Sequence, residues 1–178
     1  NLFEMNVGRT IVVDNSHGVN GPYNTFFRNR LEGYGIFFSA SNSPYQNFLG
    51  NDVTNTSLTG LALFFSYFFQ GTNHFRHGNN NKGTIDAAGT SVLSDESYAY
   101  NARPDFVPIA QWSAIGTPNS PGVASIPARD RFINNNLLKD CCTNYWTGTT
   151  DTDWNNTTNW GNGEPTNELD IIIANNCS

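Results

Sequence analysis

Short apolar runs recur along the first half of the chain, and each of them follows a glycine. The runs are Ile11–Val13, Ile36–Phe38, Leu61–Leu63 and Thr84–Ile85. None continues with the periodicity of an amphipathic helix, and apolar runs of this length between turn residues are typical of β-strands. The longest apolar stretch, Leu61–Phe69, is interrupted by Ser66 and predicts a buried strand. The pattern therefore predicts an all-β fold.

Identical residues also recur at a nearly constant spacing. Two sets have members 22 positions apart: Tyr23, Tyr45 and Tyr67, and Asn29, Asn51 and Asn73. One step earlier the spacing is 23, from Asn6 to Asn29. Tetratricopeptide-type helical repeats need about 34 residues. A repeat of about 22 with strand-length apolar runs predicts a β-solenoid, in which equivalent residues of successive coils stack about 4.8 Å apart.

The recurring asparagine is predicted to be structural rather than ligand-binding. Asparagine tolerates the left-handed backbone conformation of a turn. Its side-chain amide can also bond the equivalent asparagine one coil away, which gives a ladder along the solenoid. The expected ladder consists of Asn6, Asn29, Asn51 and Asn73.

The repeat also points to a family. The segment from Asn24 to Ile36 has the pattern N-x-F-x-x-N-x-hydrophobic followed by Gly-Ile. This pattern resembles the right-handed parallel β-helix repeats of pectate-lyase-like proteins, and the resemblance covers residues 1 to about 86. It implies a right-handed parallel β-helix of about 22 residues per coil, with residues 1–86 as its C-terminal coils. Such folds serve lyases, hydrolases, epimerases, tailspikes and adhesins, so the fold leaves the function open.

Residues 87–140 lack the repeat and are rich in small polar residues and proline. We expect them to form a capping or connecting segment, because the end of a solenoid has to cover its core and its strand edges. The apolar side chains available for this are Phe106, Val107, Ile109 and Trp112. A short helix is predicted over residues 127–138.

Residues 141–178 have a different signature, with W-x-G at Trp146, W-x-N at Trp154 and N-W at Trp160. It resembles a Trp-rich β module of large secreted and surface proteins of the Bacteroidetes, which implies the start of an incomplete module in a fragment of such a protein. The tryptophans either stack on glycans or form the core of the module; the core is favoured. Cys141 and Cys142 are adjacent, so a vicinal disulfide and a bridge to Cys177 are both open. A structural bridge closing the module is favoured.

Composition narrows the function classes. The chain of 178 residues has 27 asparagines, only 13% charged residues and a net charge of −6. Typical domains carry about 25% charged residues. An acidic chain has no electrostatic footprint for a phosphate backbone, so nucleic-acid binding is not expected. No apolar run is long enough to span a membrane. No motif indicates a cofactor or a metal site. The scarcity of lysine, the abundance of Asn, Thr, Ser and Gly, and the cysteines late in the chain favour an extracellular or cell-surface location.

One row of residues is a candidate for chemistry. Stacking the coils at a period of 22 aligns Arg30, Asp52 and His74, each directly after a ladder asparagine. On an outer face, such a row supplies a base for a sugar proton and a cation for a uronate carboxylate. The alternative, a charge ladder between neighbouring strands, is favoured because no further carboxylate pair accompanies the row.

We therefore expect a fragment of a large secreted or cell-surface β-helix protein with a structural or adhesive role that binds glycans or surfaces. Its expected partners are a polysaccharide or cell-surface glycan and other chains of a surface assembly. The first alternative is a polysaccharide lyase or glycoside hydrolase with its active site mostly upstream, although an enzyme is less favoured. The second is a secretion substrate captured with its outer-membrane export machinery.

Overall fold

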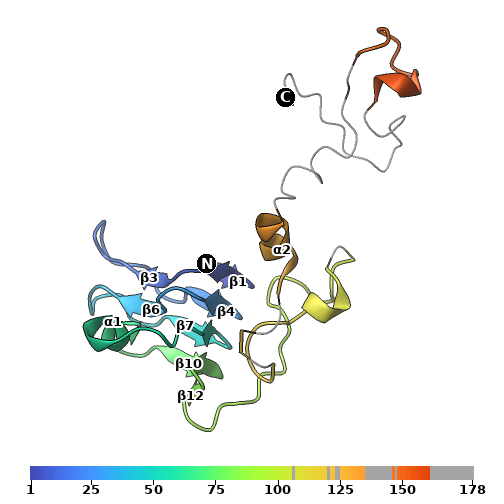
Figure 1. Cartoon of the computed structure of the whole chain (residues 1–178). Coiled ribbons are helices and arrows are strands. Elements are labelled where there is room, and N and C mark those ends of the chain that lie inside the picture. The colour runs from blue at the N-terminus through green and yellow to red at the C-terminus, as the bar shows by residue number, and fades with distance from the viewer. Residues whose placement is uncertain (106, 120, 123–124, 135–145, 147, 161–178) are drawn as a thin grey trace. The chain divides into compact units, whose positions relative to one another are not determined.

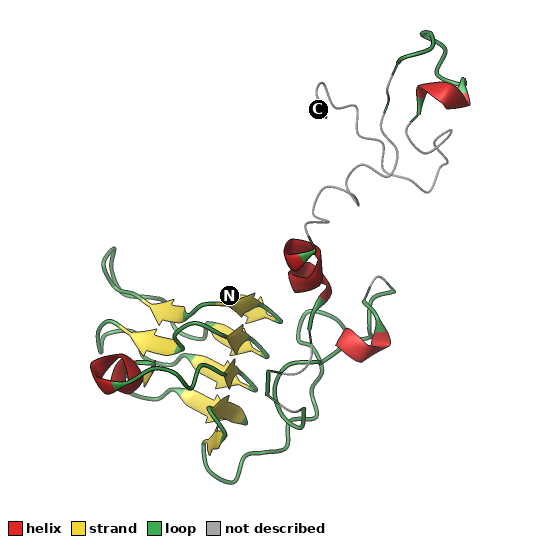
Figure 2. Ribbon diagram, viewed as in Figure 1, coloured by secondary structure: helices red, strands yellow, loops and turns green. Residues whose placement is uncertain are grey.

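Three β-sheets wind through the first part of the chain, and each of the first three coils contributes one short strand to each sheet (Figures 1 and 2). The computed structural model describes residues 1–105, 107–119, 121–122, 125–134, 146 and 148–160. Sheet A contains β1 (Leu2–Glu4), β4 (Thr25–Phe27), β7 (Asn47–Leu49) and β10 (Phe75–His77). Sheet B contains β2 (Val7–Gly8), β5 (Arg30–Leu31), β8 (Asp52–Val53), β11 (Asn79–Asn81) and β12 (Thr84–Asp86). Sheet C contains β3 (Ile11–Val13), β6 (Ile36–Phe38) and β9 (Tyr67–Phe68).

Neighbouring strands are parallel in all three sheets, except that β12 turns back antiparallel on β11. A parallel stack of strands, each from the next coil of one chain, is a β-solenoid of about three turns. The predicted all-β parallel β-solenoid is therefore confirmed.

The predicted uniform coil length is wrong in the third coil. Equivalent ladder asparagines are 23 and then 22 residues apart, but the next step is 28. The extra length lies between β8 and β9, where helix α1 (Gly60–Phe65) is inserted.

The stretch Leu61–Phe69, predicted as a buried strand, is divided between α1 and β9. No side chain of α1 is buried, so its apolar residues lie outside the coil rather than in its core. Tyr67 of β9 takes the inward position next to Ile36, which the repeat had given to the Leu61–Leu63 run.

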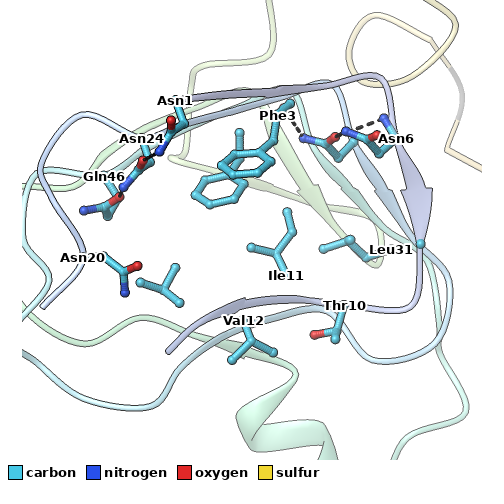
Figure 3. Close-up of a pocket in the computed structure, with 14 residues that line it drawn as sticks. Asn1, Phe3, Asn6, Thr10, Ile11, Val12, Asn20, Asn24, Leu31 and Gln46 are labelled. Atoms are coloured by element: carbon cyan, nitrogen blue, oxygen red, sulfur yellow. Dashed lines mark hydrogen bonds between the residues drawn. The ribbon is translucent and has the colours of Figure 1, made fainter. Parts of the chain in front are cut away.

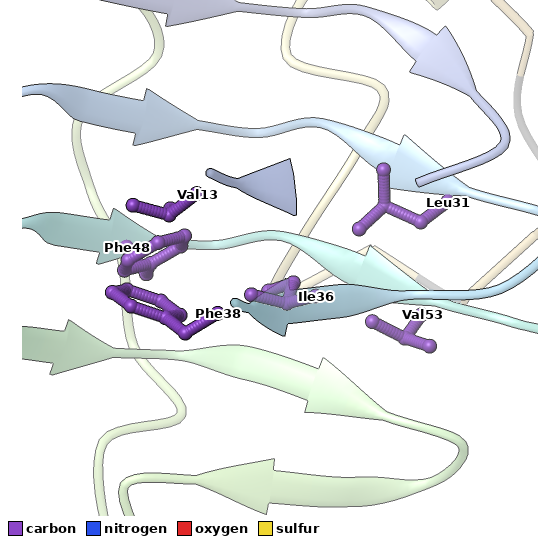
Figure 4. Packing of buried hydrophobic residues seen from close by; sticks show 6 residues of the cluster. All are labelled: Val13, Leu31, Ile36, Phe38, Phe48 and Val53. Carbon is purple, nitrogen blue, oxygen red and sulfur yellow. The ribbon is translucent and has the colours of Figure 1, made fainter. Parts of the chain in front are cut away.

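The core lies inside the coil, between the three sheets (Figure 4). Its fully buried members are Val13, Leu31, Ile36, Phe38, Phe48 and Val53. Side chains alternate between the two faces of a strand, so the neighbours of these residues point outward. Phe3, Phe26 and Phe48 stack with ring centroids 5.0 and 4.8 Å apart. Core residues of one coil therefore contact their equivalents in the next.

The turn between sheets A and B depends on one residue in the left-handed conformation. In successive coils this residue is Met5 (φ +51°), Arg28 (φ +50°), Gly50 (φ +60°) and Gly78 (φ +61°). Each of these residues precedes a ladder asparagine. We expected the ladder asparagine itself to have this conformation, and that expectation is wrong: the preceding residue makes the bend, which leaves the asparagine side chain free to join the coils.

The segment after β12, which we call the strap, consists of the described residues between 87 and 126; it runs along the side of the solenoid and contacts all of its coils. It contains a short 3-10 helix (η1, Ile109–Gln111). The carboxylate of Glu4 in the first coil accepts hydrogen bonds from the hydroxyl of Ser97 and the backbone of Tyr98 (2.8 Å). At the other end, Thr117 bonds the carbonyl of Gly78 (3.4 Å).

The strap buries a second apolar cluster formed by Phe27, Leu49 and Leu93. The ring of Tyr98 also stacks on Phe27 with the centroids 4.2 Å apart. Of the apolar residues expected to cover the core, Ile109 is exposed, Val107 and Trp112 are half-buried, and Phe106 lies outside the described residues. The contacts on this flank are made by Leu93 and Tyr98, which the sequence did not single out.

The chain divides into two compact units, residues 1–129 and 130–178. The helix predicted over 127–138 is observed as α2 (Pro127–Ile133), and residues 135–138 lie outside the described part. In the second unit, η2 (Thr157–Asn159) lies between two of the tryptophans. Within the described residues, no helix is long and apolar enough to cross a membrane.

Gly116 of the strap lies directly against the backbone of the solenoid. Its φ is +84°, and a Cβ added there would lie 2.0 Å from the carbonyl oxygen of Gly50. We expect Gly116→Ala to lower the free energy of unfolding by about 3 kcal/mol. Gly122→Ala is the matched control, because Gly122 also has a positive φ (+73°) but its added Cβ meets only Thr54, at 3.7 Å. The control should cost about 1 kcal/mol, and equal losses in urea denaturation would contradict the close approach.

Candidate functional site

An asparagine ladder joins the coils, as predicted. The side-chain amide of Asn6 donates to Asn29 Oδ1 (2.9 Å), that of Asn29 to Asn51 Oδ1 (3.0 Å), and that of Asn51 to Asn79 Oδ1 (2.8 Å). Each acceptor oxygen also takes the backbone N–H of the asparagine above it. The ladder therefore holds both the side chains and the turns of successive coils.

The fourth member of the ladder is Asn79, so the prediction of Asn73 is wrong. The insertion of α1 shifts the register by six residues, which is the difference between the 28-residue and 22-residue steps. Asn73 instead has a φ of +60° at another turn, where it occupies the position held by Tyr23 (φ +63°) and Tyr45 (φ +59°) in earlier coils.

The predicted row of Arg30, Asp52 and His74 is not formed. Asp52 is paired with Arg30 on one side and with Asn80 on the other. The same six-residue shift places His74 elsewhere, with its ring nitrogens next to the backbone N–H of Gln46 (3.3 Å) and the carbonyl of Gln70 (2.8 Å). His74 therefore belongs to a different row of the solenoid.

Arg30 and Asp52 do lie side by side, but under the strap rather than on an open face. Arg30 Nε is 4.0 Å from Asp52 Oδ2, and each side chain is 1% exposed. Burial raises the pKa of Asp52, and the backbone N–H groups of Gly116 and Gly122 together with Arg30 oppose that rise. Burial likewise lowers the pKa of Arg30. The pair packs under the strap as a buried ionic contact, out of reach of a polymeric substrate.

His74 belongs to a second, outer ladder. Asn1 Nδ2 donates to Asn24 Oδ1 (2.8 Å), and Asn24 Nδ2 donates to Gln46 Oε1 (2.9 Å). Gln46 N then donates to His74 Nδ1. These residues are the first position of the N-x-F-x-x-N pattern, in which Gln46 replaces asparagine. The first position of the pattern therefore marks the outer ladder in the sequence. Only its last member, His74, was not recognised, because the insertion of α1 lengthens the coil before it.

Arg28 is the main residue that the sequence did not reveal. Its guanidinium donates to four strap carbonyls, those of Leu93 (3.0 Å), Asp95 (2.9 Å), Ile115 (2.7 Å) and Thr117 (3.3 Å). Arg28 is 1% exposed. Burial lowers its pKa, while the nearby Glu96 and Asp95 oppose that shift. Arg28 therefore fastens the strap to the second coil.

The outer face of sheet C carries an aromatic surface, defined as Val12, Phe37, Phe64, Phe65 and Phe68. Val12, Phe37 and Phe68 are paired across β3, β6 and β9. The rings of Phe37 and Phe68 stack at 6.3 Å, and Phe64 of α1 is 61% exposed. The stretches 33–51 and 53–73 that build coils two and three here contain no Asp, Glu, Lys or Arg. The five side chains of the aromatic surface are therefore apolar, and Arg76 lies at its edge, in a recess that Phe64 and Phe68 also line.

The three tryptophans of the second unit contact one another. Trp146 and Trp154 stack with centroids 5.3 Å apart, and Trp160 meets Trp154 edge-on at 4.5 Å. Trp160 is buried and donates its indole N–H to the carbonyl of Trp154 (2.9 Å). Trp154 keeps 41% of its surface exposed. Buried Asn159 accepts from the backbone of Thr150 and donates to Asp151.

The predicted disulfide cannot be placed, since Cys141, Cys142 and Cys177 lie outside the described residues. Among the side chains that are described, no group of three or more His, Cys, Asp or Glu could hold a metal ion. No protein-family model, curated protein or solved structure matches the chain.

Proposed function

We propose that this is a secreted or cell-surface β-solenoid protein with a structural or adhesive role, and that the aromatic surface binds neutral glycans. The observation that carries the proposal is a cluster of aromatic rings around the exposed Phe64, built from stretches of the chain that contain no charged residue. Sugar rings present apolar C–H faces to aromatic side chains and hydroxyls to polar ones. Serine, threonine and asparagine are plentiful in stretches 33–51 and 53–73, and they offer the hydrogen bonds that a neutral saccharide needs.

The rigid coil supports the same role. Two ladders, a stacked core and the strap join every coil to its neighbours, so the aromatic surface is held on a stiff scaffold. We also propose that the solenoid is a right-handed β-helix of the pectate-lyase type. The second unit is, in this proposal, a Trp-rich module like those of Bacteroidetes surface proteins. Both assignments rest on the N-x-F-x-x-N pattern and on the motifs around Trp146, Trp154 and Trp160.

The enzyme alternative gains no support from the described residues. Its acid–base row required Arg30, Asp52 and His74 on one open face. Two of these side chains are buried under the strap, and the third lies in the outer ladder.

Affinity electrophoresis in gels containing soluble β-glucan, mannan or xylan tests the proposal, with polygalacturonate as the acidic comparison. We expect retardation by at least one neutral polymer, and Phe64→Ser should weaken that binding about tenfold. The matched control is Phe75→Ser, because Phe75 is also exposed (54%) but lies on sheet A. Both variants should unfold at nearly the wild-type temperature. An absence of binding to all neutral polymers, or equal losses in the two variants, would contradict the proposal.

A further inference from the structure

The first coil presents an open cross-section of the solenoid core. A recess of about 360 Å³ lies there, lined by Phe3, Ile11 and Leu31 among others (Figure 3). Phe3 is the end ring of the Phe3–Phe26–Phe48 stack and is 45% exposed, whereas Phe48 is fully buried. The apolar column of the core therefore ends in an accessible ring.

Three strand edges surround this recess. β1, β2 and β3 are each the last strand of their sheet, paired on one side only within the described residues. Unpaired strand edges favour pairing with a further strand. Here three such edges lie in one coil, so they are arranged to accept three strands that arrive together.

The inner ladder also ends at this face. Asn29, Asn51 and Asn79 each accept, on the side-chain oxygen, a backbone and a side-chain N–H from the asparagine above. Asn6 is the first member of the ladder, and within the described residues no donor reaches its side-chain oxygen. This oxygen is positioned to take the same two hydrogen bonds.

The opposite end of the solenoid is capped in one sheet, sheet B, whereas β9 and β10 are the edge strands of sheets C and A. There β12 lies antiparallel on β11, which ends the parallel stack in sheet B. Asp86 of β12 accepts from Tyr67 Oη (2.8 Å) and from Arg76 Nη1 (3.2 Å). The guanidinium of Arg76 lies over the ring of Phe69, 5.0 Å from its centroid. The two ends therefore differ: within the described residues, all three strand edges of the first coil are unpaired, whereas one of the three at the other end is capped by β12.

We propose that the face formed by β1, β2 and β3 is a docking surface for one further β-solenoid coil of the N-x-F-x-x-N type. The second asparagine of that coil donates its backbone and side-chain N–H groups to Asn6 Oδ1. Its phenylalanine stacks on Phe3 and covers the recess. The inference does not rest on glycan binding, since it concerns another face of the molecule.

A duplication of the first coil tests this proposal. A copy of residues 1–23 is fused to the N-terminus of the full chain, which reproduces the Tyr23–Asn24 junction between the first two coils. The backbone amides of Thr25, Arg30 and Glu32 donate to the coil above them. Their equivalents in the first coil are Leu2 and Val7 by strand pairing, and Arg9 by the same 23-residue step. We expect hydrogen exchange at these three amides to slow at least tenfold.

The matched control carries Phe3→Ser and Asn6→Ala in the added copy only. It has the same length and junction but lacks the stacking ring and the ladder donor, so exchange should stay at the wild-type rate. Unchanged exchange with the intact copy, or equal protection with the control copy, would overturn the proposal. A dimer of the original chain in light scattering, with the same amides already protected, would also overturn it, because a second copy would then occupy the face.

Discussion

Replacing Asn51 with aspartate should cost about 4 kcal/mol of unfolding free energy at pH 7, which corresponds to a pKa shift of about three units. Asn51 is fully buried, and its amide nitrogen donates to the carbonyl of Phe26 (2.9 Å) and to Asn79 Oδ1 (2.8 Å). A carboxylate would place an oxygen against these two acceptors. Burial and the facing oxygens both disfavour the charged form, so the pKa of the new carboxyl should rise far above its usual value of about 4.

The pH dependence of this variant has a definite sign. A folded-state pKa above the unfolded value means that the folded protein holds the proton more tightly. The penalty is therefore smallest below about pH 4 and grows as the pH rises toward the folded-state pKa. Urea denaturation of Asn51→Asp between pH 4 and pH 7 should show stability falling relative to wild type.

The control is Asn73→Asp, the position that a constant 22-residue period assigns to the ladder. Among the described residues, the Asn73 side chain bonds only its neighbour Thr72, at 3.4 Å, and aspartate tolerates its positive φ. We expect a loss below about 0.5 kcal/mol and no pH-dependent penalty. Similar behaviour of the two variants would favour the uniform register over the observed one.

The ladder also shows how much of the fold could be predicted from the sequence. Stacked asparagines and phenylalanines contact their own equivalents, so the repeat in the sequence is the repeat in space, and the first three coils followed from it. The predicted 22-residue register is wrong after α1, because the apolar stretch Leu61–Phe69 fits a buried strand as well as an exposed helix and its composition does not distinguish the two. The sequence nevertheless held a correcting signal: Gly50–Asn51 recurs as Gly78–Asn79, and this pair marks the bend and the ladder in both coils.

The strap was less predictable for a different reason. Arg28 looks like a solvated residue in a polar turn, and its partners are backbone carbonyls 65 to 89 positions later in the chain. A carbonyl has no sequence signature, so no motif identifies such a contact. Arg30 and Asp52 were correctly seen as neighbours, but whether they face solvent depended on where the strap lies. The predicted acid–base row therefore failed for two reasons: the strap covers Arg30 and Asp52, and the insertion of α1 moves His74 to another row.

Arg28→Met should release the strap and cost about 4 kcal/mol, because each buried acceptor left without a donor costs about 1–3 kcal/mol and part of that loss is recovered when the strap opens to water. Methionine fills much of the space of the arginine stem but donates nothing. The carbonyls of Leu93, Asp95, Ile115 and Thr117 would then lose their common donor. The expected result is a lower urea midpoint, together with faster hydrogen exchange and protease cleavage in residues 87–117.

Arg129→Met is the matched control, because Arg129 joins the solenoid through an exposed contact. Its Nη2 is 2.8 Å from Glu32 Oε2, and the two side chains are 32% and 36% exposed. Solvent screens such a pair, so its loss should cost about 0.5 kcal/mol. The amides of Tyr98 and Ala99, which bond Glu4, discriminate the outcomes. If they stay protected in Arg28→Met while the midpoint falls, the strap is held mainly at the first coil, and Arg28 stabilises the second coil rather than fastening the strap.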